Sequence, residues 1–253
     1  MKTIVITGAG TGIGRATAQL LSEDANNRLI LVSRSEENLI VTLNTLQHQE
    51  NHIIAPLDCR DSSAWKNFYK TMSHDFSIEA VFANAGVGGE NHYGENDRWE
   101  EVISINLTGT YVTIMEALPF IRNSKNDFRH IVITSSCLGR FGVPNYTAYC
   151  TAKTGLLGLT RSLAVELGSE HILVNAICPG WVETEMAKAG IQMLADKIGT
   201  PYQETFDDQM NIVPLQRISQ PKEIGEMVKF LMSDLQTSIT GQGIDINNGS
   251  FMI

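Results

Sequence analysis

The segment TIVITGAGTGIGRATAQLL, residues 3–21, reads as a β-branched strand, a glycine-rich turn and a helix in direct succession. Glycines let the backbone approach a pyrophosphate closely, and a helix that starts at such a turn presents free N–H groups and the positive end of its dipole. The spacing is T-G-x-x-x-G-x-G rather than G-x-G-x-x-G, so a tight strand–helix turn that binds nothing is the alternative. The segment predicts a cofactor cradle whose contacting residues are Gly8, Thr11, Gly12, Ile13 and Gly14.

The residues after the second predicted strand, Leu29–Val32, bear on the choice of cofactor. An acidic residue about 20 positions beyond the glycines would bind the ribose hydroxyls of NAD(H) and repel a 2′-phosphate. This chain has Ser33 and Arg34 there, and a hydroxyl beside a guanidinium favours a phosphate. We therefore predict NADP(H) as the cofactor. NAD(H) is the alternative, if Arg34 points to solvent.

Further strands alternate with helices along the chain. Each of three apolar strands runs into a polar or small-residue turn: residues 53–57 into Asp58, 80–83 into Asn84-Ala85-Gly86 and 130–135 into Ser136. Ligands bind at the carboxyl ends of parallel strands, so these turns are expected in one crevice, with Asp58 accepting a hydrogen bond from an adenine amine. Six or seven strands alternating with helices predict an α/β fold, a Rossmann-like, doubly wound parallel sheet in a single domain over residues 1–253.

A long amphipathic helix is expected to begin at Asp97 and to contain Asn106. Asparagine is a poor residue inside a helix, because its amide competes for the backbone hydrogen bonds. A residue that disfavours its predicted helix, with no visible compensating feature in the sequence, indicates a functional position. Asn106 is therefore a candidate site residue, and an asparagine that faces solvent is the alternative.

The stretch SCLGRFGVPNYTAYCTAK, residues 136–153, carries the groups for proton transfer. It reads as a strand end, a loop broken by Gly and Pro, and a helix in which Tyr149 and Lys153 lie one turn apart. A phenol loses its proton near pH ~10, and a neighbouring ammonium lowers that pKa toward neutrality. Such a tyrosine exchanges a proton with an alkoxide or alcohol, while the Ser136 hydroxyl holds the same oxygen. The alternative is a surface Tyr with a solvated Lys, since YxxxK occurs by chance in many chains.

Composition excludes several classes of function. The 253 residues are 43% hydrophobic and 19% charged, which is ordinary for a globular domain with a sizeable core. A net charge of -9 and a pI near 5.1 argue against a nucleic-acid partner. No apolar run approaches the ~18 residues of a membrane span, and the chain starts in a strand without a cleavable leader. Four cysteines show neither zinc spacing nor a disulfide framework, so we expect a cytoplasmic protein without a metal site or a membrane partner.

Together these features resemble the short-chain dehydrogenases/reductases, from Thr3 to about Gly249, and within that family the 3-oxoacyl-(acyl-carrier-protein) reductase-like members. Each motif is weak alone, whereas their joint order and spacing are specific: Thr7 to Gly14, Asn84-Ala85-Gly86, Asn106, Ser136, Tyr149 with Lys153, and Pro179-Gly180. The resemblance implies a single-domain Rossmann-like enzyme, usually a homotetramer. It implies hydride transfer between NAD(P)(H) and a small-molecule carbonyl/alcohol pair.

The resemblance also implies a role for each matched position. Tyr149 would be the acid/base, Lys153 would lower its pKa and bind the nicotinamide ribose, and Ser136 would hold the substrate oxygen. Asn106 would position a water between Lys153 and solvent. The other cofactor contacts that it implies are Asp58, Asn84, Ala85, Gly86, Pro179, Gly180 and Thr184.

The chain departs from the family pattern at two positions that matter here. Ala83 stands where a second Asn usually precedes Asn84, so one hydrogen bond of that turn is expected to be missing. Thr11 stands where many NADPH-specific reductases have a basic residue, so the cofactor prediction depends on Arg34 alone. Residues 185–214 are expected to form two short helices and to close over the substrate as a lid.

Three functions follow from these observations. The first is NADP(H)-dependent reduction of a ketone or β-ketoacyl substrate, in which Tyr149 protonates the oxygen that Ser136 holds. The second is an NAD-dependent secondary-alcohol or hydroxyacid dehydrogenase with the same fold. The third is a cofactor-sensing protein without chemistry, and it has no use for the full set of Asn106, Ser136, Tyr149 and Lys153. Neither the 88–94 loop nor the lid carries a charge cluster that would identify a carboxylate or phosphoryl substrate.

Overall fold

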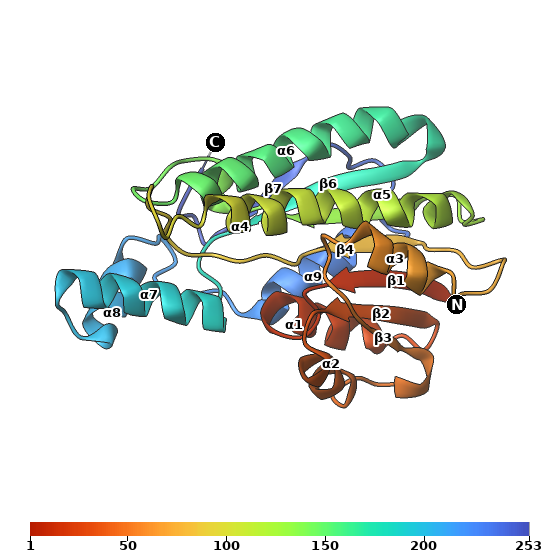
Figure 1. The fold of residues 1–253 in the computed structure, drawn as a ribbon, viewed down its shortest axis with the longest axis horizontal. Helices are drawn as coiled ribbons and strands as arrows, with labels where there is room; N and C mark the ends of the chain where they lie inside the picture. Colours follow the sequence, from red (N-terminus) through yellow and green to blue (C-terminus); the bar gives the residue numbers. More distant parts are fainter. Residues whose placement is uncertain (253) are drawn as a thin grey trace.

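The β-branched run Lys2–Thr7 forms strand β1, and the glycine turn after it leads into helix α1 at Gly12–Ser22, as the sequence predicts. The computed structural model describes residues 1–252, and the alternation of strand and helix continues through it (Figure 1). The remaining elements in chain order are β2 Asn27–Ser33, α2 Glu36–Leu43, β3 Ile53–Pro56, α3 Ser62–Tyr69, β4 Ala80–Ala83, α4 Trp99–Ile103, α5 Gly109–Arg122, β5 Arg129–Thr134, α6 Thr147–Leu167, β6 Ile172–Pro179, α7 Glu185–Ile198, α8 Tyr202–Asn211, α9 Pro221–Leu231 and β7 Gly243–Ile246.

The strands form one seven-stranded sheet in the order β3-β2-β1-β4-β5-β6-β7, and every neighbouring pair is parallel. The order reverses between β1 and β4, where Ile6 pairs with Leu31 on one side and with Phe82 on the other. A parallel sheet has its ligand crevice at such a switch point, outside the carboxyl ends of the strands. The predicted doubly wound Rossmann-like fold is therefore confirmed, and the crevice lies beyond Thr7.

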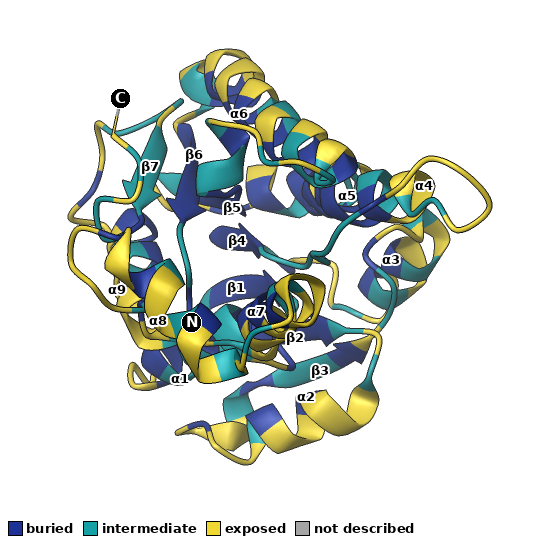
Figure 2. Ribbon diagram, turned by 90° about the vertical axis from the view of Figure 1, so that its left-hand side faces the viewer, coloured by how far each residue is buried: buried dark blue, intermediate teal, exposed yellow. Residues whose placement is uncertain are grey.

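Two hydrophobic cores cover the two faces of the sheet, because successive strand side chains point to opposite sides. Val5 packs in the core under α3, α5 and α6, whereas Ile4 and Ile6 pack in the core under α1 and α9. Trp65 on α3 and Ile224 on α9 are fully buried members of these cores. Figure 2 shows the central strands buried between helices whose outer faces are exposed, whereas the edge strands β3 and β7 are only partly buried. The buried strands hold the loops at their carboxyl ends in fixed positions.

The helix expected to begin at Asp97 begins two residues later, at Trp99. The Asp97 carboxylate remains outside the helix and accepts a hydrogen bond from the N–H of Trp99 at 3.0 Å. A five-residue π-helical segment, Ser104–Thr108, then separates α4 from α5. The predicted long helix is thus two α-helical pieces joined by a π segment, and Asn106 lies at that join.

Helices α7 and α8 form the predicted pair in residues 185–214, and they lie beyond the end of the sheet toward which the strands point (Figure 1). Their position lets them cover the crevice. Within residues 1–252, no helix is both long enough and apolar enough to span a bilayer.

Candidate active site

Helix α6 carries Tyr149 and Lys153 side by side, as their spacing predicts. The ammonium nitrogen of Lys153 lies 5.4 Å from the centroid of the Tyr149 ring. Lys153 is 3% exposed, and its Nζ donates a hydrogen bond to the carbonyl oxygen of Thr134 at 2.9 Å. Burial lowers the pKa of Lys153 to about 8. The side chain therefore extends from α6 to the end of β5, next to the Tyr149 ring.

The Tyr149 phenol has a higher pKa than the sequence predicts. Burial raises the pKa of Tyr149 to about 12, and a hydrogen bond with the Ser136 hydroxyl lowers it only in part. The ammonium of Lys153 donates its hydrogen bond to Thr134 and not to the phenol, and it does not offset the effect of burial on the pKa of Tyr149. The phenol is therefore protonated at neutral pH, which is the form that gives a proton to an alkoxide.

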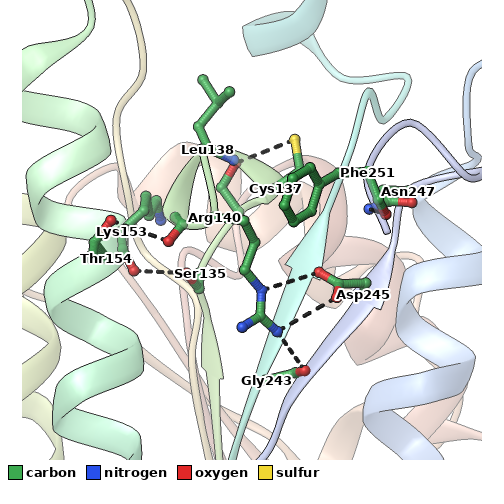
Figure 3. A network of polar contacts seen from close by, with 12 residues as sticks. Ser135, Cys137, Leu138, Arg140, Lys153, Thr154, Gly243, Asp245, Asn247 and Phe251 are labelled. Carbon is green, nitrogen blue, oxygen red and sulfur yellow. Dashed lines mark hydrogen bonds and ion pairs between the residues drawn. The ribbon is translucent and has the colours of Figure 1, made fainter. Parts of the chain in front are cut away.

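Ser136 follows β5 by two residues and opens a short 3-10 turn. Its Oγ accepts a hydrogen bond from the N–H of Leu138 at 3.1 Å, and the same hydroxyl lies close enough to the Tyr149 phenol to lower the pKa of that phenol. The preceding residue, Ser135, donates from its Oγ to the carbonyl oxygen of Lys153 at 2.8 Å (Figure 3). The end of β5 and the turn of α6 that carries the phenol and the ammonium are thus fixed to each other.

The turn after Ser136 is also anchored to the edge of the sheet, through Arg140 (Figure 3). The Arg140 guanidinium donates to the carbonyl oxygen of Gly243 at 2.7 Å and pairs with the Asp245 carboxylate at 3.4 Å. Only 14% of the Arg140 side chain and 21% of the Asp245 side chain are exposed. Sequence reasoning missed this pair, because the two residues are 105 positions apart.

Asn106 is fully buried in the π-helical segment, which excludes the alternative that it faces solvent. Its Nδ2 donates to the carbonyl oxygens of Val102 and Val87 at 2.9 Å each, and its Oδ1 accepts from the N–H of Val87 at 3.2 Å. The side-chain amide satisfies a carbonyl of its own helix, so an asparagine is accommodated there. Segments of π-helix occur frequently at functional sites. Asn106 therefore ties the helix to the turn that follows β4.

Gly86 lies between Asn106 and Lys153. A Cβ built on Gly86 would come 2.6 Å from the Oδ1 of Asn106 and 3.5 Å from the Nζ of Lys153. No side chain fits at this position without displacing the asparagine. Three of the predicted site residues, from three different segments, therefore meet at one point.

Asn84 joins the ends of three strands at the switch point. Its backbone N–H, and that of Ala85, donate to the Oγ1 of Thr7 at 2.9 and 3.0 Å. Its Nδ2 donates to the carbonyl oxygen of Thr7 at 3.1 Å, and its Oδ1 accepts from the hydroxyl of Thr134 at 3.0 Å. The two threonines were not among the predicted site residues. The signal that could have found them is that each is a hydroxyl residue at the last position of its strand.

The glycine turn after β1 has the shape of an anion cradle. Gly8 and Gly12 have φ angles of +67° and +50°, which favour glycine. A Cβ on Gly14 would fall on the carbonyl oxygen of Gly8, so α1 approaches β1 too closely for a side chain. Thr11 makes no side-chain cap, the first turn of α1 contains no acidic residue, and Ile13 packs against the core. These features fit the pyrophosphate of a dinucleotide, whose charge the N-terminus of α1 would complement.

The loop after β6 faces the glycine turn. A methyl carbon of Thr184 would be 3.1 Å from a Cβ built on Gly12. The Oγ1 of Thr184 also accepts a hydrogen bond from the N–H of Ala187 at 3.2 Å and so caps α7. Thr184 therefore links the turn to the first residue of the lid.

Pro179 and Gly180 end β6 at the neighbouring position of the sheet edge. The N–H of Gly180 donates to the carbonyl oxygen of Ile246 at 3.1 Å. A Cβ on Gly180 would lie 3.0 Å from the Cα of Asn247, so the glycine allows the close approach of the chain after β7. The glycine thus has a packing role in the structure, whatever it contacts in a complex.

The corner beside β2 and β3 holds the residues predicted to select the cofactor. Ser33 donates from its Oγ to the carbonyl oxygen of Ser35 at 3.0 Å, and Arg34 is exposed. Both carboxylate oxygens of Asp58, the predicted acceptor for an adenine amine, accept hydrogen bonds from the Arg60 guanidinium. These bonds lower the pKa of Asp58, and the more distant charge of Arg34 lowers it further. Arg60 is therefore neutralised by Asp58, whereas Arg34 keeps its charge available.

The lid contacts the loop after β4 at both ends of α7. The sulfur of Met186 would be 3.0 Å from a Cβ on Gly88, and the Nζ of Lys197 pairs with the Oε1 of Glu90 at 3.1 Å. The other oxygen of Glu90 bonds the ring of His92 at 3.0 Å. Residues 88–90 and α7 are thus in contact near both ends of the helix.

Two further observations limit what the site contains and how far it extends. In residues 1–252, no cluster of three or more His, Cys, Asp or Glu side chains is placed to hold a metal ion. A cavity of about 800 Å³ beside the N-terminus of α6 lies outside the site, since none of the predicted catalytic residues lines it. Its walls are Asn91, His92, Tyr93, Asp97, Trp99, Glu100, Asn145 and Thr147.

Comparison with known proteins identifies the family. The family model described as "Enoyl-(Acyl carrier protein) reductase" matches residues 8–250. The chain belongs to the short-chain dehydrogenase/reductase family. The expected resemblance is thereby confirmed over nearly the whole chain, and this short-chain dehydrogenase/reductase is an oxidoreductase dependent on NAD(P).

Individual relatives are similar over their full length. The chain is 32% identical to a 3-oxoacyl-(acyl-carrier-protein) reductase of Aquifex aeolicus over 255 residues, 99% of this chain and 97% of the relative. It is similar in structure to an actinorhodin polyketide ketoreductase variant with NADPH, with a TM-score of 0.91, 29% identity and coverage of 98% and 97%. It is also similar to a carveol dehydrogenase from Mycobacterium avium in complex with NAD, with a TM-score of 0.87, 28% identity and coverage of 98% and 97%.

Proposed function

We propose that this short-chain dehydrogenase/reductase reduces a ketone or β-ketoacyl group to a secondary alcohol with NADPH. The observation that carries the proposal is the assembly of Tyr149, Lys153 and Ser136 beside the crevice at the switch point, with a dinucleotide cradle next to it. NADPH would supply the hydride, held by the glycine turn, by Asn84 to Gly86 and by the loop from Pro179 to Thr184. Side chains of the protein then donate the proton and hold the substrate oxygen.

Tyr149 supplies the proton in this proposal. Its phenol is protonated at neutral pH, because burial raises its pKa to about 12. A carbonyl oxygen that becomes an alkoxide has a far greater affinity for a proton than the phenol, so the proton moves to the substrate. The Ser136 hydroxyl, whose proximity already lowers the pKa of the phenol, would hold the same oxygen and fix its direction.

Lys153 and Asn106 support that step. The ammonium next to the ring would stabilise the phenolate left after proton transfer, since an opposite charge nearby favours the ionised form. Asn106 holds the Val87 backbone and lies at Gly86 together with the ammonium. It is thereby placed to keep a path for protons from solvent to Lys153. This is the role that we propose for it.

The preference for NADP(H) depends on Arg34. A 2′-phosphate needs a cation that is not already paired, and Arg60 in the same corner pairs with Asp58. Arg34 is exposed beside Ser33, so its guanidinium is available to a phosphate, while the Ser33 hydroxyl donates to Ser35 and would have to turn to bind one. No acidic residue occupies the position that would repel it. These features favour NADP(H) over NAD(H).

The alternative with the same fold is oxidation of a secondary alcohol or hydroxyacid with NAD. The carveol dehydrogenase in complex with NAD supports this candidate, whereas the 3-oxoacyl reductase relatives and the polyketide ketoreductase with NADPH support reduction. A panel of ketones and β-ketoacyl esters assayed with NADPH and with NADH, and the matching alcohols assayed with both oxidised cofactors, separates the two. A higher kcat/KM for alcohol oxidation with NAD would overturn the proposal.

The variant Tyr149→Phe tests the chemistry directly. It should lower kcat on the order of 100-fold to 10,000-fold, the usual contribution of a general acid. Binding of NADPH, followed by its fluorescence, should remain within about twofold, because the ring is kept. Tyr146→Phe is the matched control, since Tyr146 packs edge-on against Tyr149 at 6.3 Å between ring centroids. Unchanged turnover in Tyr149→Phe would show that another group donates the proton, whereas a protein that only senses its cofactor would reduce no ketone with either residue at position 149.

We infer a homotetramer in the cytoplasm, as is usual for the family. Apolar side chains on the outer face of two adjacent helices support an interface, because Tyr111 on α5 is 49% exposed and Val165 on α6 is 86% exposed. All four cysteines are free, which fits a reducing compartment. Light scattering of the purified protein and fractionation of the cells that make it check the two inferences.

A further inference from the structure

The first turn of α6, which leads into Tyr149, is capped from a distant part of the chain. Helix N-termini leave backbone N–H groups without partners, and a local side chain usually satisfies one of them. The residue at the N-cap position, Tyr146, makes no such bond. Instead the Oδ1 of Asn91 accepts hydrogen bonds from the N–H of Ala148 at 2.9 Å and from the hydroxyl of Thr147 at 3.0 Å. Ala148 is the immediate neighbour of Tyr149.

The same asparagine also holds the strained residue that turns the chain into α6. Asn145 has a φ of +65°, in the left-handed region that residues other than glycine seldom adopt. Its carbonyl oxygen accepts a hydrogen bond from the backbone N–H of Asn91 at 2.8 Å. Such a conformation persists only where the surrounding contacts fix it. Asn91 therefore sets both the direction in which α6 starts and the partner of its first turn.

The other half of the Asn91 amide is fixed by Asp97. The Nδ2 of Asn91 donates to the Oδ1 of Asp97 at 3.2 Å, and the same oxygen accepts from the N–H of Trp99 at the start of α4. Helix α4 continues into the π segment that carries Asn106. Asn91 is 8% exposed, whereas its bond to Asp97 is partly buried and the bond from Trp99 to Asp97 is exposed. One side chain thus joins the starts of the two helices that carry Asn106 and Tyr149.

We propose that Asn91, oriented by Asp97, is the positioning residue that fixes the Tyr149 phenol against Ser136. This rests on the proposed ketone reduction, because Tyr149 is its proton donor. A shift of about 1 Å in a reacting group costs on the order of 100-fold in rate. The side-chain bonds that join Asn91 to Ala148, Thr147 and Asp97 are called the Asn91 bracket. Loss of the bracket would release the first turn of α6 while the backbone bond to Asn145 remains, and so would move the phenol.

Position 91 carries an amide and position 97 a carboxylate, so substitutions that change either group test the positioning role. Asn91→Ala removes every side-chain bond, and kcat should fall between roughly 10-fold and 100-fold. Asn91→Asp keeps the acceptor for α6 but sets a second carboxylate against Asp97, so kcat should fall at neutral pH. As the pH is lowered, one of the two carboxyls takes up a proton and donates to the other. The ratio of its kcat to that of the unmodified protein should therefore rise reversibly in acid.

The exchange variant Asn91→Asp/Asp97→Asn tests the pair itself. The carboxylate at position 91 still accepts from α6, and the amide at position 97 donates to it and accepts from Trp99. Its kcat at neutral pH should return to within about threefold of the unmodified protein. Asn96→Ala, at an exposed asparagine of the same loop, is the matched control and should change nothing. The melting temperature of each variant shows whether it folds.

Two readouts keep this proposal apart from the proposed function. NADPH affinity should stay within about twofold in all variants, since no residue of the bracket belongs to the glycine turn or the Arg34 corner. The rate of hydrogen–deuterium exchange at the Ala148 amide should rise in Asn91→Ala. In the double variant Asn91→Asp/Asp97→Asn that rate should be low again, whether or not a ketone is turned over. If the unmodified protein reduces no ketone, the proposed function fails and the exchange rates still test the bracket. Full kcat in Asn91→Ala, or an exchange variant no better than Asn91→Asp, would overturn the positioning role.

Discussion

The ammonium of Lys153 lies 5.4 Å from the centroid of the Tyr149 ring and donates its hydrogen bond to the carbonyl oxygen of Thr134. The lysine is thus held by the end of β5, with its charge beside the phenol ring. Burial keeps the phenol protonated and at the same time lowers the pKa of the lysine to about 8. The two groups therefore change charge in different pH ranges, and the lysine is the one that titrates near neutrality.

This difference predicts how the reductive rate depends on pH. The Tyr149 phenol keeps its proton up to a pKa of about 12, whereas Lys153 is charged only below its pKa of about 8. As the pH rises through that value the ammonium is lost, and the phenolate formed during proton transfer loses its stabilising charge. The kcat with NADPH and a saturating ketone should fall roughly tenfold from its plateau to pH ~9.

The same series with Lys153→Met assigns the effect. This variant should be slow throughout and should show no break near pH ~8, because the titrating group is gone. A break of unchanged position in Lys153→Met would assign the pH dependence to another residue.

A second prediction concerns Arg34, in the corner beside β2 and β3. Arg34→Asp should weaken NADPH binding roughly 10-fold to 150-fold, since a hydrogen bond to a charged group contributes about 1.5–3 kcal/mol. NADH binding should be unchanged or tighter, because a carboxylate can take the ribose hydroxyls. Dissociation constants from cofactor fluorescence measure both effects.

Arg161→Asp supplies the control for net charge, because Arg161 is an exposed arginine on α6. It should leave both affinities within about twofold. Equal losses of NADPH affinity in the two variants would show that overall charge, and not the corner at Arg34, selects the cofactor.

A third prediction uses a residue away from the site. His130 on β5 is 1% exposed, and neither of its ring nitrogens has a partner among the described residues. Burial lowers the pKa of His130 to about 4. The unfolded chain takes up a proton near pH ~6.5 while the folded chain does not, so stability falls as the pH drops below that value. The loss between neutral pH and pH ~5 is about 2 kcal/mol.

Urea unfolding at the two pH values measures that loss. His130→Leu should remove it, because no titrating group remains at the buried position. His74→Leu, at an exposed histidine, should retain it. If His130→Leu shows the same acid destabilisation as the unmodified protein, the loss originates elsewhere.

Patterns within a few residues predict most of this fold and part of its site. The strand, turn and helix of residues 3–21 follow from β-branched residues, glycines and a helical run, and the structure has them in place. Asn106 could be singled out because it breaks a local helix rule, and the π segment is the physical reason. The direction of the Lys153 ammonium could not be predicted, since its partner Thr134 lies on another element. The hydrogen bonds of Asn91 could not be predicted either, since its partner Ala148 is 57 positions away in the sequence.

The last prediction concerns the lid. The Lys197 ammonium on α7 pairs with the Glu90 carboxylate at 3.1 Å, and the Glu90 side chain is only 18% exposed. If residues 185–214 close over the substrate, Lys197→Met should weaken closure by the ~0.2–1 kcal/mol of such a pair and raise the KM for the ketone about 1.5-fold to 5-fold. The effect should shrink at high salt, which screens the pair in the unmodified protein. Lys188→Met is the control, because Lys188 pairs with Glu185 inside the same helix and not across the crevice. Equal KM values in the two variants, at low salt, would show that the Glu90 contact does not hold α7 over the site.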